Sequence, residues 1–452
     1  MKKLVASVGL VALGASTLQA ASLPNFLTES GKPWSISATL RGFYDDNINS
    51  LPDNFPMDGY ERDSFGFQVS PTLSLSLNPS QTTSLRAGYT YSFLWYANKL
   101  YSSSDHNDQT HQFDFELNHA FSERYTMDVR DSFVIGQEPD MLRTGDALTS
   151  FQRIPGDNIR NFGAINADAE LTHLLGVEVG YANSYFDYAA NAPVYGYLFG
   201  FAPYVAQPSI GGLLNRIDNT VHLDTRWHLQ PTTVAVAGYR FDDVDYTSDS
   251  VIFGGDPFGF LPTVTSDERN SRSHTGYVGL DETFRPDLTG SLRVGGEYTE
   301  YYNDPSGMTS VSPYVQASLR WTYQPESFVE MGVSHDRNAT DLLGDPTKGN
   351  ITVDQESTVV YASITQKLFS KVYANLLGRF QDSTFNGGVI NNTSERYYEF
   401  GANLQYRFNP NISTSVGYTY DNLDSPEVVY SGTGYNRSFD RNRVYIGLTA
   451  TY

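Results

Sequence analysis

The chain has 452 residues, with 51 acidic side chains against 30 basic ones, and its formal net charge is −21. Nucleic-acid phosphates require a basic surface, so we expect no nucleic-acid partner. The absence of cysteine excludes a lipoprotein anchor, disulfides, thiolate metal sites and a cysteine nucleophile.

The first twenty residues have the layout of a secretory signal. Two lysines precede an apolar stretch at residues 4–15, and a small-residue cleavage site ends at Ala20. An apolar stretch of about twelve residues is too short to span a bilayer as a helix. We therefore expect a signal peptide over residues 1–20, Sec export, and one mature domain over residues 21–452.

Alternation of apolar and polar residues is the main structural signal in the rest of the chain. In residues 85–95 the odd positions are Leu, Ala, Tyr, Tyr, Phe and Trp, and the residues between them are mostly small or polar. Similar alternation is found at residues 36–44, 64–77, 112–117, 398–408 and 443–452. Membrane-barrel strands alternate in this way, which is why a mean hydropathy of −0.38 does not exclude membrane insertion.

Short breaks between these stretches predict tight turns. Eight of them are found, at residues 77–80, 121–124, 173–176, 229–232, 284–287, 323–326, 369–371 and 408–411. Eight turns imply sixteen strands, and residues 36–44 and 443–452 would pair with each other to close a ring of eighteen.

The other breaks are longer and rich in Asp, Asn, Gly and Pro, as at residues 137–158, 191–216, 248–269 and 421–436. Short turns at one rim and long loops at the other are typical of outer-membrane barrels. We predict an all-β fold: a single transmembrane antiparallel up-and-down β-barrel of about 18 strands, with short periplasmic turns and long extracellular loops. A large secreted all-β enzyme is the alternative that composition alone leaves open.

A Gly-Tyr pair followed by an aromatic two residues later recurs at Tyr89, Tyr239 and Tyr418. The alternation places each of these tyrosines on the lipid side, late in a strand that rises from a short turn. We expect them to form the outer aromatic girdle, with their hydroxyls among the headgroups.

Both ends of the predicted barrel resemble known proteins. The closing segment, residues 443–452, ends on Tyr452 and resembles the last strand of bacterial outer-membrane proteins, whose terminal aromatic, more often Phe, is read by the barrel-assembly machinery. The opening Gly42-Phe43-Tyr44-Asp45-Asp46-Asn47-Ile48 resembles that of the putative β-barrel porins of the second type. This resemblance implies a barrel embedded in outer-membrane lipid.

The alternation also predicts which charged residues point into the lumen. One arc of the wall is acidic, with Asp114, Glu116, Asp128, Asp168, Glu170, Glu178 and Asp224. The facing arc is basic, with Arg41, Arg86, Arg293, Arg320, Arg379, Arg407 and Arg443. Opposed charges of this kind would orient polar solutes and set an ion preference. The alternative is that these charges pair with their neighbours in a wet lumen.

Two connections are unusually apolar for exposed loops, at residues 194–201 and 251–261. They could fold into the lumen, which we favour, pack on each other, or meet a partner subunit.

The sequence predicts a porin-like channel for passive diffusion of small hydrophilic solutes, without cofactors and not an enzyme. The alternative is a barrel that exports a polysaccharide or anchors surface components. An outer-membrane hydrolase is less favoured, because His222 and Asp224 lack a nucleophile motif. The acidic residues 242–245 lack the spacing of a calcium loop. Oligomeric state is left open.

Overall fold

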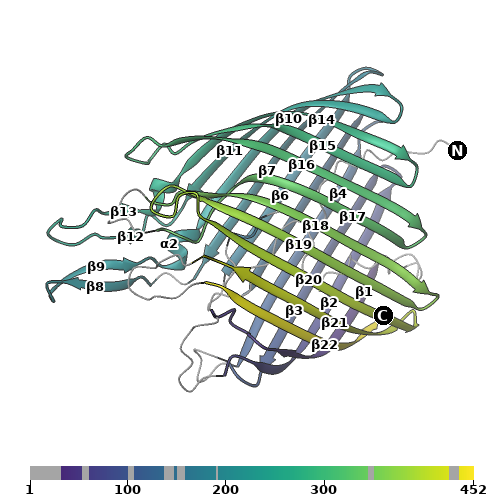
Figure 1. Cartoon of the computed structure of the whole chain (residues 1–452). Coiled ribbons are helices and arrows are strands. Elements are labelled where there is room, and N and C mark those ends of the chain that lie inside the picture. The colour runs from purple at the N-terminus through teal and green to yellow at the C-terminus, as the bar shows by residue number, and fades with distance from the viewer. Residues whose placement is uncertain are drawn as a thin grey trace.

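The computed structural model describes residues 32–52, 61–99, 106–136, 147–149, 158–189, 192–344, 351–426 and 437–452. The expected signal peptide, residues 1–20, lies outside the described residues. Eighteen strands form one antiparallel sheet that closes on itself. The predicted barrel and its strand number are therefore confirmed (Figure 1).

The barrel strands follow chain order around the wall. They are β1 (Trp34–Asp45), β2 (Ser64–Ser80), β3 (Thr83–Tyr96), β4 (Asn107–Ala120), β5 (Tyr125–Gly136), β6 (Asn158–Glu170), β7 (Leu175–Tyr188), β10 (Arg216–Gln230), β11 (Thr233–Tyr246), β14 (Ser271–Arg285), β15 (Leu288–Glu300), β16 (Thr309–Gln324), β17 (Ser327–Asn338), β18 (Asp354–Phe369), β19 (Val372–Asn386), β20 (Ser394–Asn409), β21 (Ile412–Asp424) and β22 (Phe439–Thr451).

The connections at the long-loop rim carry short elements of their own. These are β8 (Val194–Leu198), β9 (Ala202–Gln207), α2 (Ile210–Leu214), β12 (Val251–Phe253), β13 (Val264–Thr265) and the 3-10 turn η1 (Ser266–Arg269). Within the described parts of the chain, no helix has the length and apolar character needed to cross a membrane.

The ring closes where the sequence predicts, between the first and last strands. Their register runs from Ser37 opposite Thr451 to Asp45 opposite Arg443. Tyr452 extends the seam, because its N–H donates to the carbonyl of Ile36 at 2.8 Å and its carbonyl accepts from the N–H of Ile36 at 3.1 Å. Closure pairs both edges of each of the eighteen barrel strands, which a barrel in lipid requires.

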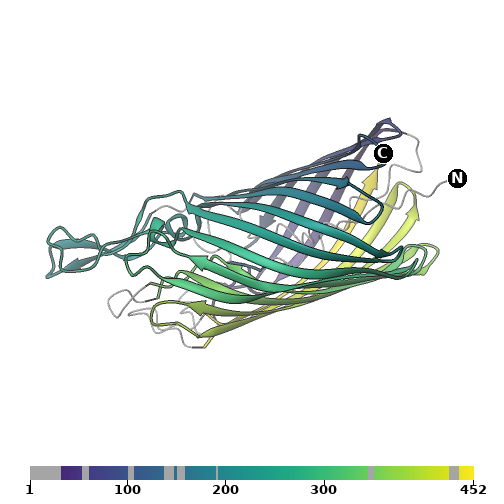
Figure 2. The ribbon, with the colours of Figure 1, turned by 90° about the horizontal axis from the view of Figure 1, so that it is seen from above.

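All eight predicted short turns lie at the rim that also holds Tyr452. The long connections lie at the opposite rim, where several extend well beyond the wall (Figure 2). Strands joined by only a few residues must be antiparallel neighbours, so these turns determine the strand order locally.

The outer face of the wall is apolar and ends in an aromatic girdle near the long loops. Side chains such as Leu40, Phe65 and Ile446 are more than half exposed, as lipid-facing residues are. Girdle tyrosines bond diagonally to a polar residue on the next strand, nearer the loops: Tyr89 to His111, Tyr91 to Gln109, Tyr181 to Asn219, Tyr239 to His274, Tyr418 to Asn442 and Tyr420 to Asp440. This placement agrees with the expected role of Tyr89, Tyr239 and Tyr418 at the headgroups.

Candidate functional site

The barrel encloses a cavity of about 1090 Å³. Ten carboxylates from the described residues line it: Asp128, Asp168, Glu178, Asp218, Asp224, Asp242, Asp281, Glu297, Asp336 and Asp354. Eight arginines line it as well: Arg130, Arg160, Arg216, Arg226, Arg240, Arg269, Arg293 and Arg337. So many ionisable groups around one space are typical of a polar lumen and not of an apolar core.

One group of paired charges lies on the wall from β6 to β10. The Arg226 guanidinium donates to Asp168 at 3.0 Å and to Glu178 at 3.1 Å through the same nitrogen. His222 Nε2 lies 3.5 Å from the Glu178 carboxylate. The register of β6, β7 and β10 places these side chains on one face, so neighbouring strands suffice to assemble the group.

A second group is centred on Arg240 of β11. Its guanidinium donates to Asp336 of β17 at 2.8 and 2.9 Å and to Asp242 at 2.7 Å, and it lies 3.6 Å from Glu297. The ring of Tyr314 stacks near it at 4.9 Å. β11 and β17 are four strands apart, about 19 Å along the wall. Arg240 therefore crosses the curved lumen instead of following the wall.

The acids predicted to face the lumen occupy two zones. Four of them line the cavity: Asp128, Asp168, Glu178 and Asp224. Asp224 accepts a hydrogen bond from the Tyr277 hydroxyl. Asp114, Glu116 and Glu170 lie outside the cavity lining. Asp114 accepts from Ser132 at 2.9 Å, Glu116 pairs with Arg86 at 3.2 Å, and Glu170 faces His228 at 3.1 Å.

The basic residues predicted to face the lumen each have a local partner. Arg293 pairs with Asp281 at 2.8 Å, and Arg320 pairs with Glu330 at 3.5 Å. The remaining contacts are Arg379 with Gln381 at 3.2 Å, Arg443 with Thr419 at 3.4 Å, Arg407 at 4.1 Å from the Tyr373 ring and Arg41 at 4.7 Å from the Tyr445 ring. Of this basic set, only Arg293 lines the cavity.

The division into an acidic and a basic arc is therefore incomplete. Arg160 and Arg226 lie within the arc expected to be acidic, and Glu297 and Asp336 lie within the arc expected to be basic. Arg240 and Asp242 were missed as lumen residues although the alternation carries the signal, since both are an even number of positions from the inward Gly238. Nothing in the local sequence indicates that Arg240 meets Asp336, because 96 residues separate them.

One described segment of a long loop, residues 147–149, contacts strands across the lumen. The backbone N–H of Leu148, in the connection from β5 to β6, donates to the Gln381 side chain at 2.8 Å. The Leu148 carbonyl accepts from the amides of Gln355 and Gln381, each at 2.9 Å. The Leu148 side chain packs against Tyr397, Leu423 and Phe439. These partners lie on β18 to β22, on the other side of the ring, so residues 147–149 narrow the cavity that they help to line.

The mouth is covered on one side by a packed cap. Buried apolar side chains from four connections meet there: Leu213, Leu214, Ile252, Phe253, Val264, Tyr301, Leu343, Ile351 and Val353, together with Tyr188 from the end of β7. The buried Arg269 guanidinium donates to the carbonyls of Val353, Leu213 and Thr340, which ties three connections together. Burial raises the pKa of Tyr301 well above its usual value, and the neighbouring Asp354 carboxylate raises it further.

Two connections extend beyond this cap and form what we call the aromatic finger, which consists of the β8–β9 hairpin and residues 250–262. The backbones of Val205 and Gly254 exchange hydrogen bonds at 2.8 and 3.0 Å, which joins the two parts. Their rings also meet, with Phe199 at 5.6 Å from Phe260 and Phe201 at 6.0 Å from Phe258. Of the arrangements considered for these apolar segments, packing on each other is the one observed, and the expectation that they fill the lumen is wrong for the tips.

His222 and Asp224, the pair considered for a hydrolase, have separate partners: His222 faces Glu178, and Asp224 accepts a hydrogen bond from the Tyr277 hydroxyl. Asp242 and Asp243 point to different partners, Arg240 and Arg272. In the described ranges no group of three or more metal-ligating side chains could hold a metal ion.

Comparison with known proteins adds family information for the second half of the barrel. A family model described as Putative beta-barrel porin 2 matches residues 260–452, which include β14 to β22. No curated protein matches the chain.

Solved structures with similar folds include OccAB4 of Acinetobacter baumannii, at 10% identity and a TM-score of 0.42, and OpdK of Pseudomonas aeruginosa with vanillate, at 11% and 0.40. Each alignment covers 93% of this chain and 99% of the other chain. The family match over residues 260–452 names the same family as the resemblance of the opening strand, and together with the closed ring of strands it indicates an outer-membrane β-barrel.

Proposed function

We propose that this protein is a channel for the passive diffusion of small hydrophilic solutes across the outer membrane. The observation that carries the proposal is the charged cavity of about 1090 Å³ inside the closed ring. Barrels of roughly 16 to 18 strands have room for an aqueous channel. A polar solute exchanges hydrogen bonds with such a lining, whereas an apolar one gains nothing from it.

The charge of the lining bears on selectivity. Ten carboxylates face eight arginines in the cavity, so the described lining has a small acidic excess. Most of these charges are paired at hydrogen-bond distance, which leaves a weak net field. We propose a modest cation preference, controlled by the fourteen residues predicted from the alternation together with Arg160, Arg240, Asp242 and Asp336.

Single-channel recording is the direct test. Purified protein inserted into a planar bilayer is expected to produce discrete, ohmic current steps, with a reversal potential shifted slightly toward that of the cation in a salt gradient. Preparations of detergent and lipid without protein are the control. Folded, β-rich protein that inserts but passes no current would contradict the channel.

The second candidate is a barrel that exports a polysaccharide or anchors surface components. The cap tied by Arg269 and the crossing at Leu148 favour it, because both reduce the free opening. The same recording separates the two, since a blocked lumen supports export or anchoring and an open one supports diffusion.

Biogenesis and surroundings belong to the same proposal. Residues 1–20 direct Sec export, the barrel-assembly machinery reads Tyr452, and outer-membrane lipid covers the apolar belt. Tyr452→Phe is expected to keep the amount of barrel in the outer membrane, and Tyr452→Ser to lower it. Equal amounts for the two variants would show that the terminal ring is not read.

A further inference from the structure

The aromatic finger presents an uncovered cluster of rings at its tip. Phe199, Phe201, Phe258 and Phe260 are 74%, 66%, 59% and 63% exposed. The β8–β9 hairpin and the β12–β13 connection, which carry these residues, project farther from the barrel than the other described connections in both ribbon views (Figures 1 and 2). Four phenylalanines held together in water at the end of a projection are costly unless another surface covers them.

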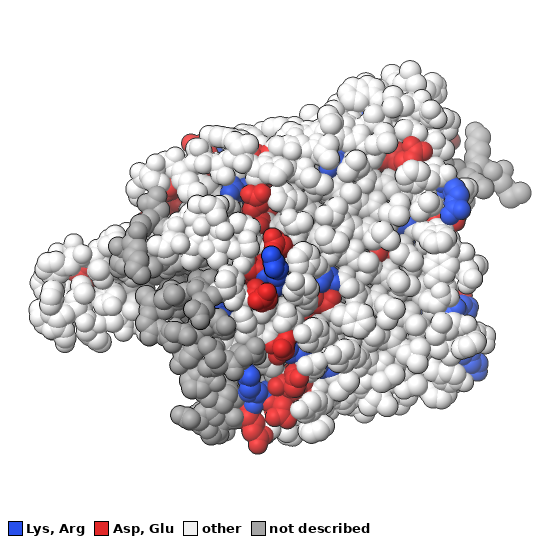
Figure 3. Space-filling view, in the orientation of Figure 1, with Lys and Arg blue, Asp and Glu red and all other residues white. Residues whose placement is uncertain are grey.

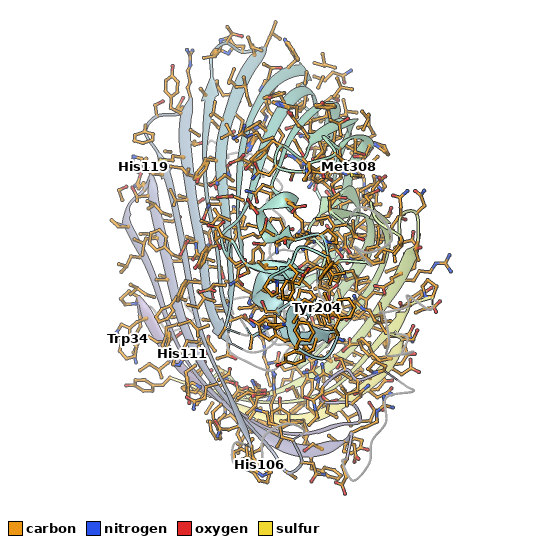
Figure 4. The ribbon with its side chains drawn as sticks, turned by 90° about the vertical axis from the view of Figure 1, so that its left-hand side faces the viewer. Trp34, His106, His111, His119, Tyr204 and Met308 are labelled. Atoms are coloured by element: carbon orange, nitrogen blue, oxygen red, sulfur yellow. The ribbon has the colours of Figure 1, made fainter. Side chains whose placement is uncertain are left out.

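The finger is built to hold these rings in place. Ala202, Val205 and Phe253 are buried within it, and the Tyr204 ring packs edge-on against Phe253 at 6.5 Å. Figure 4 shows where Tyr204 lies. The Asp256 carboxylate accepts hydrogen bonds from the backbone N–H groups of Phe258, Phe260 and Leu261, at 3.0, 3.2 and 2.8 Å. The tip is thus pre-organised, which reduces the entropy lost on binding.

The chemistry of the finger is apolar and uncharged. Residues 194–207 contain no charged side chain, and residues 250–262 contain only Asp256, which is turned toward the backbone. The finger is accordingly almost free of charged atoms in the space-filling view (Figure 3). Tyr195, Tyr197 and Tyr204 lie behind the phenylalanines along the hairpin.

We propose that the tip of the aromatic finger inserts into a zwitterionic phospholipid bilayer that faces the long-loop side of the barrel. Phenylalanines would enter the acyl region while the tyrosine hydroxyls stay at the headgroups, the same order that the barrel's own girdle shows. The absence of basic residues indicates that neutral lipid, and not anionic lipid, is the target.

Other occupants fit the surface less well. A protein interface has a polar rim with directional hydrogen bonds, and the finger offers only three tyrosine hydroxyls around its rings. Copies side by side in one membrane point their fingers in the same direction, so their tips cannot meet end to end.

The test uses the full-length protein in lipid nanodiscs, mixed with phosphatidylcholine vesicles and separated by flotation. The wild type is expected to float with the vesicles, equally well at low and high salt. Phe201→Ser should weaken binding roughly tenfold, as expected when one buried ring is lost. The matched control, Val389→Ser, removes an exposed apolar side chain from the β19–β20 loop at the same rim and should leave binding unchanged.

A second readout covers the case in which a serine disturbs the finger. Phe201→Trp should be quenched by brominated phosphatidylcholine, and Val389→Trp should not. Replacing all four phenylalanines with leucine should preserve flotation. The proposal is overturned if the wild type does not float with the vesicles or if binding requires anionic lipid. It is also overturned if protein-bearing nanodiscs associate with one another through the same rings but not with protein-free phosphatidylcholine nanodiscs, which would indicate a second copy as the partner.

Discussion

At the scale of single residues, most charged side chains in the lumen pair with a nearby side chain of opposite charge. They do not form one acidic wall that faces one basic wall. Arg293 holds Asp281, Arg320 holds Glu330, and Arg226 is shared by Asp168 and Glu178. Removing one member of a pair exposes the charge of the other. Replacing one member of a pair with a neutral residue therefore adds a full unpaired charge to the pore, which changes the electric field more than the loss of a weak dipole would.

This pairing sets the direction of a charge-neutralisation experiment. Replacing Arg293, Arg320, Arg379 and Arg407 with glutamine should raise cation preference, and replacing Asp114, Glu116, Asp168 and Glu170 with their amides should lower it. Reversal potentials under a salt gradient measure both effects. They should be clearest in dilute salt, because the screening length falls from about 10 Å at 0.1 M to about 3 Å at 1 M. Unchanged reversal potentials in a conducting pore would show that these side chains do not control permeation.

Asp256 provides a residue-scale test of the finger. Its partial desolvation favours the protonated form, but the backbone N–H donors of Leu261, Phe260 and Phe258 outweigh this and lower the pKa of its carboxyl. Its stabilising effect is therefore complete above the pKa of the unfolded chain and is lost as the pH falls through the lower folded pKa. Asp256→Asn should speed amide exchange at Phe258, Phe260 and Leu261 at neutral pH, while exchange in the barrel strands stays the same. Unaltered exchange at these three amides would show that the carboxylate does not hold the turn.

At the scale of elements, the connections differ more than the strands do. Strands repeat one pattern eighteen times, whereas the long loops separate into a cap, a finger and a crossing segment. The crossing segment, residues 147–149, is anchored at Leu148, whose carbonyl accepts hydrogen bonds from the side-chain amides of Gln355 and Gln381. Because residues 147–149 lie beside the cavity, we expect this segment to restrict the passage.

Releasing that segment should widen the pore. Gln355→Ala combined with Gln381→Ala removes the amide donors to Leu148 and is expected to increase single-channel conductance and its fluctuations. Gln316→Ala is the matched control, because Gln316 also lines the cavity but makes no described contact with residues 147–149. A double variant with wild-type conductance would place the constriction elsewhere.

At the scale of the whole molecule, the two rims predict an orientation. Long polar loops do not easily cross a bilayer, so the rim that carries the finger should face outward and the rim with Tyr452 should face the periplasm. Tags inserted near Ser248 or Asn158 should be reached by antibody on intact cells. Tags near Pro286 or Pro325 should be reached only after the outer membrane is permeabilised, and the reverse pattern would refute the orientation.

Strand number, strand order and the inward or outward direction of most side chains follow from the sequence by itself. The reason is that alternation and tight turns are local: a side chain two residues along a strand returns to the same face, and a short turn makes the next strand a neighbour. This periodicity predicts an inward direction for Arg293 and Asp168, and both side chains line the cavity.

Only the tertiary structure decided which of those side chains meet. Arg240 reaches Asp336 because the wall curves, and Leu148 reaches Gln381 because β5 and β19 face each other across the ring. The loops have no periodicity that would indicate the cap or the joining of the β8–β9 hairpin to residues 250–262. Such contacts depend on the closure of the whole barrel, which brings together residues that are far apart in the chain.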